Sequence, residues 1–197
     1  MAAGAMGVVI QNYDQLIKDI SNINKNTQKA VSRTISDFKS RGPGWISQEV
    51  TNEYNIKKKD VNETRSTRKG ASTIKVAGTK VDDIEIIYRG RLLTPTHFSM
   101  KPTSRPNSGA YTVSAQIKKS SGRKALGSNV FLASSGAAGT TQIPFQRRGT
   151  ARLPVDVIKT LSVPQMVTNE KVAENINKRI QEELGKRLEH NLKQLVK

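Results

Sequence analysis

The chain has 197 residues, a length that suits a single domain. It contains no cysteine, which excludes disulfides and thiolate metal sites. No run of residues approaches the roughly 20 consecutive apolar positions that a membrane-spanning helix needs, so we expect no membrane segment. Lys and Arg number 33 against 16 Asp and Glu, which gives a net charge of +17.

The excess positive charge is concentrated in the middle of the chain. Residues 1–56 carry a net charge of +1, residues 57–152 carry +14, and residues 153–197 carry +2. A field of this sign attracts polyanions, of which nucleic acid is the commonest. A solubilising surface is the alternative, but the excess is large for that purpose. We therefore expect an acidic partner, mainly a phosphate backbone.

The first third of the chain, residues 12–68, is predicted to be helical behind a flexible extension over residues 1–11. Residues 12–40 show apolar positions at steps of three and four, which is typical of an amphipathic helix. Gly and Pro at residues 41–44 are predicted to end this helix, and a second helix is predicted over Trp45–Tyr54. The apolar positions of the first helix are Tyr13, Leu16, Ile17, Ile20, Ile23, Ala30, Val31, Ile35 and Phe38.

A short polar helix is predicted between Lys57 and Arg68, with Ile56 and Val61 as its apolar contacts. Residues 72–152 then form a basic region whose hydrophobic pattern changes to the period of strands. Strands are predicted over residues 72–77, 81–88, 110–118, 129–133 and 141–148.

Two features qualify this β-rich region. Pro144 cannot donate a ladder hydrogen bond, so the strand over residues 141–148 is predicted to be an edge or bulged strand. Long turn-rich stretches over residues 94–109 and 118–128 are predicted to be basic loops, because Pro, Gly and Ser recur in them.

The last segment, residues 169–197, is the most periodic and predicts a long amphipathic helix. We expect its apolar stripe to pack on the protein's own sheet, with contact to a neighbouring subunit as the alternative. The order of elements predicts an α+β fold, with an antiparallel or mixed sheet packed by the two terminal helices. The stripe consists of Val172, Ile176, Ile180, Leu184, Leu188, Leu192 and Val196.

Residues suited to catalysis are scarce. His97 and His190 are the only histidines, and each is interpreted as a solvated surface residue. Asp82, Asp83 and Glu85 form a carboxylate cluster, for which neutralisation by nearby bases is favoured over a divalent metal site. No phosphate-binding loop, dinucleotide motif or zinc spacing occurs. We therefore expect no enzymatic activity, no cofactor and no metal.

The basic middle of the chain provides the candidate site. Its cations lie in predicted loops, with few aromatic residues to stack on bases, which favours sequence-independent contact with phosphates. The candidate polyanion-binding residues are Lys57, Lys58, Lys59, Arg65, Arg68, Lys101, Arg105, Lys118, Lys119, Arg123, Lys124, Arg147, Arg148 and Arg152.

Residues 129–168 also carry a recognisable pattern. A strand ending in basic residues and Gly leads to an Arg-x-Pro-Val turn, and a Ser-Val-Pro segment then precedes the last helix. This arrangement resembles the minor tail protein Z family of tailed phages, which are tail completion proteins. The N-terminal half resembles the family more loosely. The residues that fall on the pattern are Arg152, Pro154, Val155, Val157, Ser162, Val163 and Pro164.

The resemblance implies a structural virion protein that completes or terminates the tail at its head-proximal end and enables head–tail joining. It implies assembly in the host cytoplasm as a ring around the DNA channel, most simply of six subunits. The implied partners are the tail tube, neck or connector proteins and, through non-specific contact, phage DNA. The alternative is a free, non-enzymatic nucleic-acid-binding protein. A ring-forming subunit and a monomeric binder would differ in their assembly.

Overall fold

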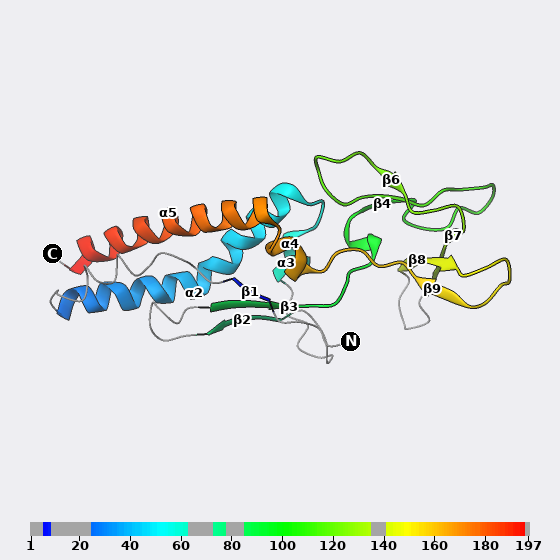
Figure 1. The fold of residues 1–197 in the computed structure, drawn as a ribbon. Helices are drawn as coiled ribbons and strands as arrows, with labels where there is room; N and C mark the ends of the chain where they lie inside the picture. Colours follow the sequence, from blue (N-terminus) through cyan, green and yellow to red (C-terminus); the bar gives the residue numbers. More distant parts are fainter. Residues whose placement is uncertain (1–5, 9–24, 63–72, 78–84, 135–140, 196–197) are drawn as a thin grey trace.

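The computed structural model describes residues 6–8, 25–62, 73–77, 85–134 and 141–195. Two long helices, α2 (Lys25–Glu53) and α5 (Glu170–Leu195), lie side by side at one end (Figure 1). Short strands, β4 to β9, form the opposite end (Figure 1). The described part of the chain is therefore an elongated α+β structure, and the predicted fold class is confirmed.

Helix α5 buries the stripe that its sequence predicts. Val172, Ile176 and Ile180 are each 1% exposed, and Leu184 is 6% exposed. Leu188 and Leu192 are half-buried, so the burial weakens toward the C-terminal end of the helix. The main partner of this stripe is α2, rather than a sheet, since the strongest packing in the structure joins these two helices.

Helix α2 is continuous where the sequence predicts two helices. It runs through Gly42 and Pro43, and Figure 1 shows a bend between its blue and cyan parts. Proline removes one helical hydrogen bond and bends a helix, but packing on both sides can keep the helix intact. Gly42 is buried against Phe38 and against Ile86 of the adjoining sheet, so burial overrides the stop signal. The predicted helix start, residues 12–24, lies outside the described residues.

The sheet beside α2 has the order β1-β3-β2 and is antiparallel, with β1 (Met6–Val8), β2 (Thr73–Ala77) and β3 (Glu85–Arg89). Met6–Val8 belongs to the segment predicted as a flexible extension, and it pairs with β3. In β3, Ile86 and Tyr88 join α2, α5 and α4 (Val163–Val167) in the larger of two cores.

Two short helices complete this half. Helix α3 (Lys58–Asn62) confirms the predicted polar turn, because Ile56 and Val61 are both buried. Helix α4 is capped by Ser162, whose side chain accepts a hydrogen bond from the Gln165 backbone N–H in a capping box.

Six short strands form two further antiparallel sheets. One has the order β4-β5-β6, and the other has the order β7-β8-β9. They surround a second, smaller core made of Met100, Val113, Ala115, Val130 and Leu132. The elements of this half are η2 (Pro95–His97), β4 (Ser99–Lys101), β5 (Ser114–Gln116), β6 (Lys124–Ala125), β7 (Val130–Ser134), β8 (Gln142–Arg147) and β9 (Val155–Val157).

The predicted loops over residues 94–109 and 118–128 therefore contain paired strands. β4 and β6 pair with the two edges of β5, and their brevity explains why the sequence shows no alternating pattern. The predicted strand over residues 110–118 is shorter than expected, although Val113 and Ala115 are buried on its predicted face.

Strand β8 lies at the centre of its sheet, so the prediction of an edge strand is wrong. Pro144 is opposite Leu132, whose N–H points away from β8 and donates to the Tyr111 hydroxyl at 3.0 Å. On its other side, the Pro144 carbonyl accepts a 3.0 Å bond from the Ile158 N–H, just beyond the end of β9. The missing proline donor therefore falls where β9 has ended, and the ladder is not interrupted.

The two halves are joined where α2 ends. The Asn55 N–H donates to the Ile117 carbonyl and the Lys119 N–H donates to the Glu53 carbonyl, both at 2.8 Å. The Asn55 side-chain amide also donates to the Gln116 carbonyl. These bonds tie the segment that follows β5 to the end of α2. They therefore hold the half that contains the larger core against the half that contains the smaller one.

A candidate polyanion-binding surface

The half of the molecule built from β4 to β9 is almost free of carboxylates. From Arg89 through Val155 the sequence has eleven Lys and Arg, Arg89 included, and no Asp or Glu. We call residues 99–158 the basic lobe; it carries nine cations and a single acidic residue, Asp156. Because few carboxylates offset the cations, the lobe presents a field of one sign.

Four cations of the basic lobe contact other groups of the protein. Lys118 lies 5.8 Å from the ring centroid of Tyr54, and Arg147 lies 5.1 Å from that of Phe131. Both distances are within the range of cation–π attraction. Arg123 donates to the Ser99 carbonyl at 2.5 Å and to the Ser99 hydroxyl at 2.9 Å, which fixes its guanidinium against β4.

Arg148 is the fourth engaged cation. It donates two hydrogen bonds to Asp156, of 2.6 and 2.7 Å, across the β8–β9 hairpin. These bonds lower the pKa of the Asp156 carboxyl and raise the pKa of Arg148. The only acidic residue of the lobe is therefore neutralised within it.

Five other cations have no hydrogen bond, ion pair or ring contact from their side chains within the described parts of the chain. All five side chains are exposed, so they can reach an external anion without breaking an internal contact. They are Lys101, Arg105, Lys119, Lys124 and Arg152.

The remaining candidates lie elsewhere. Lys57, Lys58 and Lys59 are exposed at the start of α3, in the middle of the molecule rather than in the basic lobe (Figure 1). Arg65 and Arg68 lie outside the described residues. The predicted set is thus divided between α3 and the lobe.

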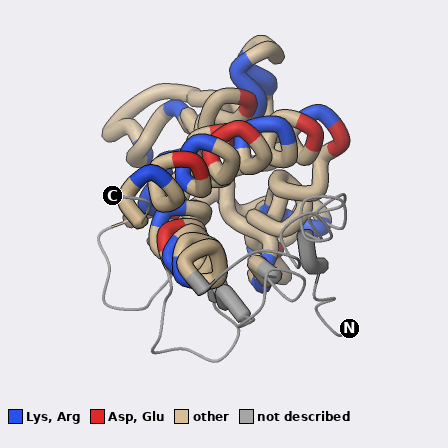
Figure 2. Tube along the Cα trace, turned by 90° about the vertical axis from the view of Figure 1, so that its left-hand side faces the viewer, with Lys and Arg blue, Asp and Glu red and all other residues tan. Residues whose placement is uncertain are grey.

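The two long helices carry nearly balanced charge, with eleven Lys and Arg against eight Asp and Glu, in contrast to the lobe. Figure 2 shows positive and negative residues alternating along α5. Between the helices, Lys171 pairs with Glu53 at 2.8 Å and Arg179 pairs with Glu49 at 2.6 Å. The hydrogen bond from Lys171 is the main cause of the lowered pKa of Glu53. These charges are satisfied within the helix pair.

Metal-binding groups are not assembled in the described part of the chain. No group of three His, Asp or Glu lies close enough there to hold a metal ion. His190 is exposed as predicted, whereas the prediction for His97 is wrong. The Nδ1 atom of His97 lies 3.4 Å from a carboxylate oxygen of Asp60. The His97 side chain is only 27% exposed, because η2 places it beside α3. Asp82 and Asp83 lie outside the described residues.

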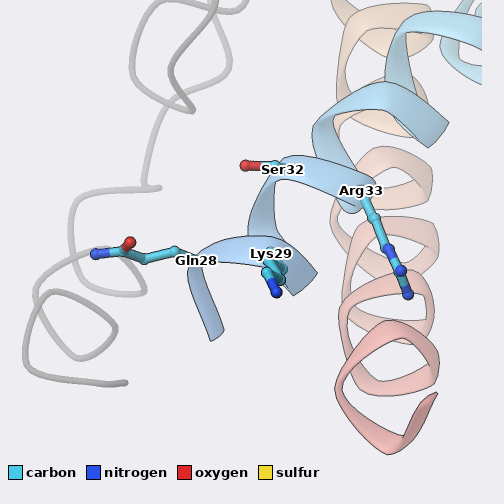
Figure 3. A pocket seen from close by; sticks show the side chains of 4 residues that line it. All are labelled: Gln28, Lys29, Ser32 and Arg33. Carbon is cyan, nitrogen blue, oxygen red and sulfur yellow. The ribbon is translucent and has the colours of Figure 1, made fainter. Parts of the chain in front are cut away.

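A shallow hollow beside the start of α2 does not form a binding site. Its lining residues are Gln28, Lys29, Ser32 and Arg33. Figure 3 shows Gln28 and Ser32 pointing away from α5 and Arg33 pointing toward it, so the side chains do not converge on one point.

None of the described helices is both long enough and apolar enough to cross a membrane.

Comparison with known families decides the identity of the chain. The sequence model of a family described as prophage minor tail protein Z matches residues 8–197. The chain belongs to this family of phage minor tail proteins. No curated protein and no solved structure was found to match it.

The residues that carry the resemblance to the minor tail protein Z family have structural roles here. Arg152 and Pro154 lie in the β8–β9 hairpin, and Val155 and Val157 form the ends of β9. Ser162 caps α4, and the two residues after it, Val163 and Pro164, are buried in the larger core or directly beside it. Sequence reasoning found these residues but missed the partners that fix Arg123, Arg147 and Arg148. No local pattern signals those partners, because each lies on another strand or turn.

Proposed function

We propose that the chain is a structural, non-enzymatic tail protein that completes the tail at its head-proximal end and enables head–tail joining. In this proposal its working form is a ring of six identical subunits around the DNA channel. The ring contacts the tail tube on one side and neck or connector proteins on the other.

The segregation of charge between the helix pair and the basic lobe carries this proposal. Helices with a small net charge can approach like neighbours without strong repulsion, whereas basic lobes repel one another. A ring places the weakly charged helices at the contacts between subunits and repeats the lobes around one axis. Six lobes, each with a net charge of +8, would present on the order of 50 excess positive charges to an acidic surface.

The polyanion-binding residues of this proposal include the exposed, unengaged cations of the lobe. Lys101, Arg105, Lys119, Lys124 and Arg152 would meet DNA phosphates or carboxylates of a neighbouring ring. Contacts of this kind are sequence-independent and weaken steeply with salt.

A free nucleic-acid-binding protein is the second candidate, and the same five cations favour it. The two candidate functions differ in whether the phage particle can assemble without the chain. A tail-completing protein is required for particle assembly, whereas a free binder acts away from the particle.

The test is complementation in a phage that lacks this gene. The mutant lysate is expected to contain DNA-filled heads and separate tails, and purified protein should restore joined, infective particles. A mutant lysate that already contains joined particles would contradict the proposed role, whatever the affinity of the protein for DNA.

A further inference from the structure

One face of the β7–β8–β9 sheet is apolar and belongs to neither core. In the observed register Phe131 lies opposite Phe145, which lies opposite Val157, and directly opposite residues share a face of a sheet. We call this the outer face. Its apolar members are Phe131, Ala133, Ile143, Phe145, Val155 and Val157, all half-buried.

The other face of the same sheet packs on the smaller core. It buries Val130 and Leu132 in the smaller core, and Pro144 lies between them and β9. A sheet with one face on a core normally has polar residues on its second face. Here the second face has apolar side chains at the end of the molecule farthest from the helices (Figure 1). A contiguous apolar patch of this kind marks an interaction site.

Positive charge lies at one end of the outer face. Arg147 stands on it, opposite Val155 and over the Phe131 ring. Arg152 follows in the hairpin, and Asp156, the one carboxylate of β9, belongs to the opposite face, where Arg148 binds it. An apolar centre with a cationic rim is complementary to an apolar surface rimmed by carboxylates.

The chemistry of the face does not suit the other candidate occupants. The rings of Phe131 and Phe145 stack with their centroids 5.9 Å apart, and Arg147 lies over the Phe131 ring, so the Phe131 ring is already engaged within the protein. The aliphatic members offer bases no stacking surface. A second copy of the same face would bring Arg147 and its neighbouring cations against an identical set.

We propose that the outer face docks on a different protein of the tail, whose surface presents aliphatic or aromatic side chains flanked by Asp and Glu. This inference rests on the proposed function, because the partner must belong to the same tail. It also assigns Arg147, which stands on this face, to carboxylates rather than to DNA phosphates.

The experiment is photo-crosslinking in intact tails. Tails are assembled with p-benzoylphenylalanine in place of Val155 or, separately, of Phe145, and the linked peptides are identified by mass spectrometry after irradiation. A matched probe in place of Gln181, exposed on α5, is the control for non-specific linking. Two positions on the face guard against a misfolded variant.

The expected result is that both probes on the outer face link to the same Asp- and Glu-containing peptide of another tail protein, and that the Gln181 probe does not. Linkage to DNA, to another copy of this chain or to a peptide without acidic residues would overturn the inference. The absence of any linkage in tails that contain the chain would also overturn the inference, but it would leave the proposed function intact. A chain that is missing from purified tails would overturn both the inference and the proposed function.

A charge variant adds an independent measure. Arg147→Glu should reduce the amount of the chain in purified tails at least tenfold, because it places a carboxylate on the outer face toward an acidic partner. Lys186→Glu on α5 is the matched control and should leave the amount unchanged. Equal incorporation of the two variants, both with the thermal midpoint of the unmodified protein, would contradict the docking proposal.

Discussion

Arg148 and Asp156 face each other across the β8–β9 hairpin and share two hydrogen bonds, of 2.6 and 2.7 Å. Both side chains are exposed, with 65% and 53% of their surfaces accessible, so water screens the pair and its contribution to stability is small. Its importance is electrostatic: it removes the only carboxylate of the basic lobe from contact with an external partner.

The hydrogen bonds from Arg148 lower the pKa of the Asp156 carboxyl below its ordinary value. Titration followed by NMR should show this lowered pKa, and Arg148→Gln should return it toward the ordinary value. Because the folded-state pKa is the lower one, the pair stabilises the protein above the ordinary carboxyl pKa. That stabilisation is lost as the pH falls through the lowered value. An unchanged pKa in Arg148→Gln would show that the pair does not form in solution.

Asp156→Asn should steepen the salt dependence of duplex DNA binding. The change releases Arg148 to contact a phosphate, and each additional phosphate contact changes the slope of log affinity against log salt by about −0.9. Fluorescence anisotropy at several salt concentrations measures this slope. Glu174→Gln makes the same charge change on exposed α5 and should leave the slope as it was. Equal slopes for both variants would place the binding surface away from Arg148.

Two glycines of α2 should respond oppositely to alanine. A Cβ on Gly42 would lie 2.9 Å from a ring carbon of Phe38 and 3.2 Å from Ile86, inside the larger core. We expect Gly42→Ala to lower the free energy of unfolding by about 1–3 kcal/mol. At Gly44 no atom lies within 4 Å of the added Cβ, so Gly44→Ala should raise it by up to about 1 kcal/mol through helix propensity. Urea denaturation measures both, and the same sign for both would contradict the continuous, packed α2.

The stripe of α5 should be a main source of stability. Single alanine substitutions at Ile176, Ile180 and Leu184 should each cost about 2–5 kcal/mol, because the side chains are buried against α2 and their loss leaves a cavity. Thermal or denaturant midpoints measure the effect, and Gln181→Ala on the exposed side is the control. Unchanged midpoints in all three stripe variants would mean that α5 does not pack as described.

Long periodic segments were predictable from the sequence because their signal is summed over many residues. The spacing of Val172, Ile176 and Ile180 predicts both the helix α5 and its buried side. It does not predict the partner, because an apolar stripe fits another helix as well as a sheet.

Short or interrupted elements were not predictable, because tertiary contacts decide them. Pro43 would end an isolated helix, yet packing of the adjacent Gly42 on Phe38 and Ile86 keeps α2 continuous. Pro144 was predicted to make its strand an edge or bulged strand, but β8 is central and the missing donor falls just beyond β9. Lys124 of β6 lies in a strand too short for any alternating pattern.

The candidate site was predictable as a list of cations but not as an arrangement. The excess charge of the middle region identified most of the basic lobe. The sequence could not reveal that Arg123, Arg147 and Arg148 contact Ser99, Phe131 and Asp156. These partners lie 24, 16 and 8 positions away in the chain, respectively, and only folding brings each pair together. Nor could it show that the two phenylalanines and the valines of β9 share one face.

The central claim, a ring that completes the tail at the end that meets the head, is tested most directly by cryo-electron microscopy of intact tails. The account predicts density for this chain as a single ring of six copies on the tail axis at the head-proximal end. The helix pairs should contact one another, and the basic lobes should face an acidic neighbour or the DNA channel. A single copy, a distribution along the whole tube, or the absence of the chain from that end would contradict the account.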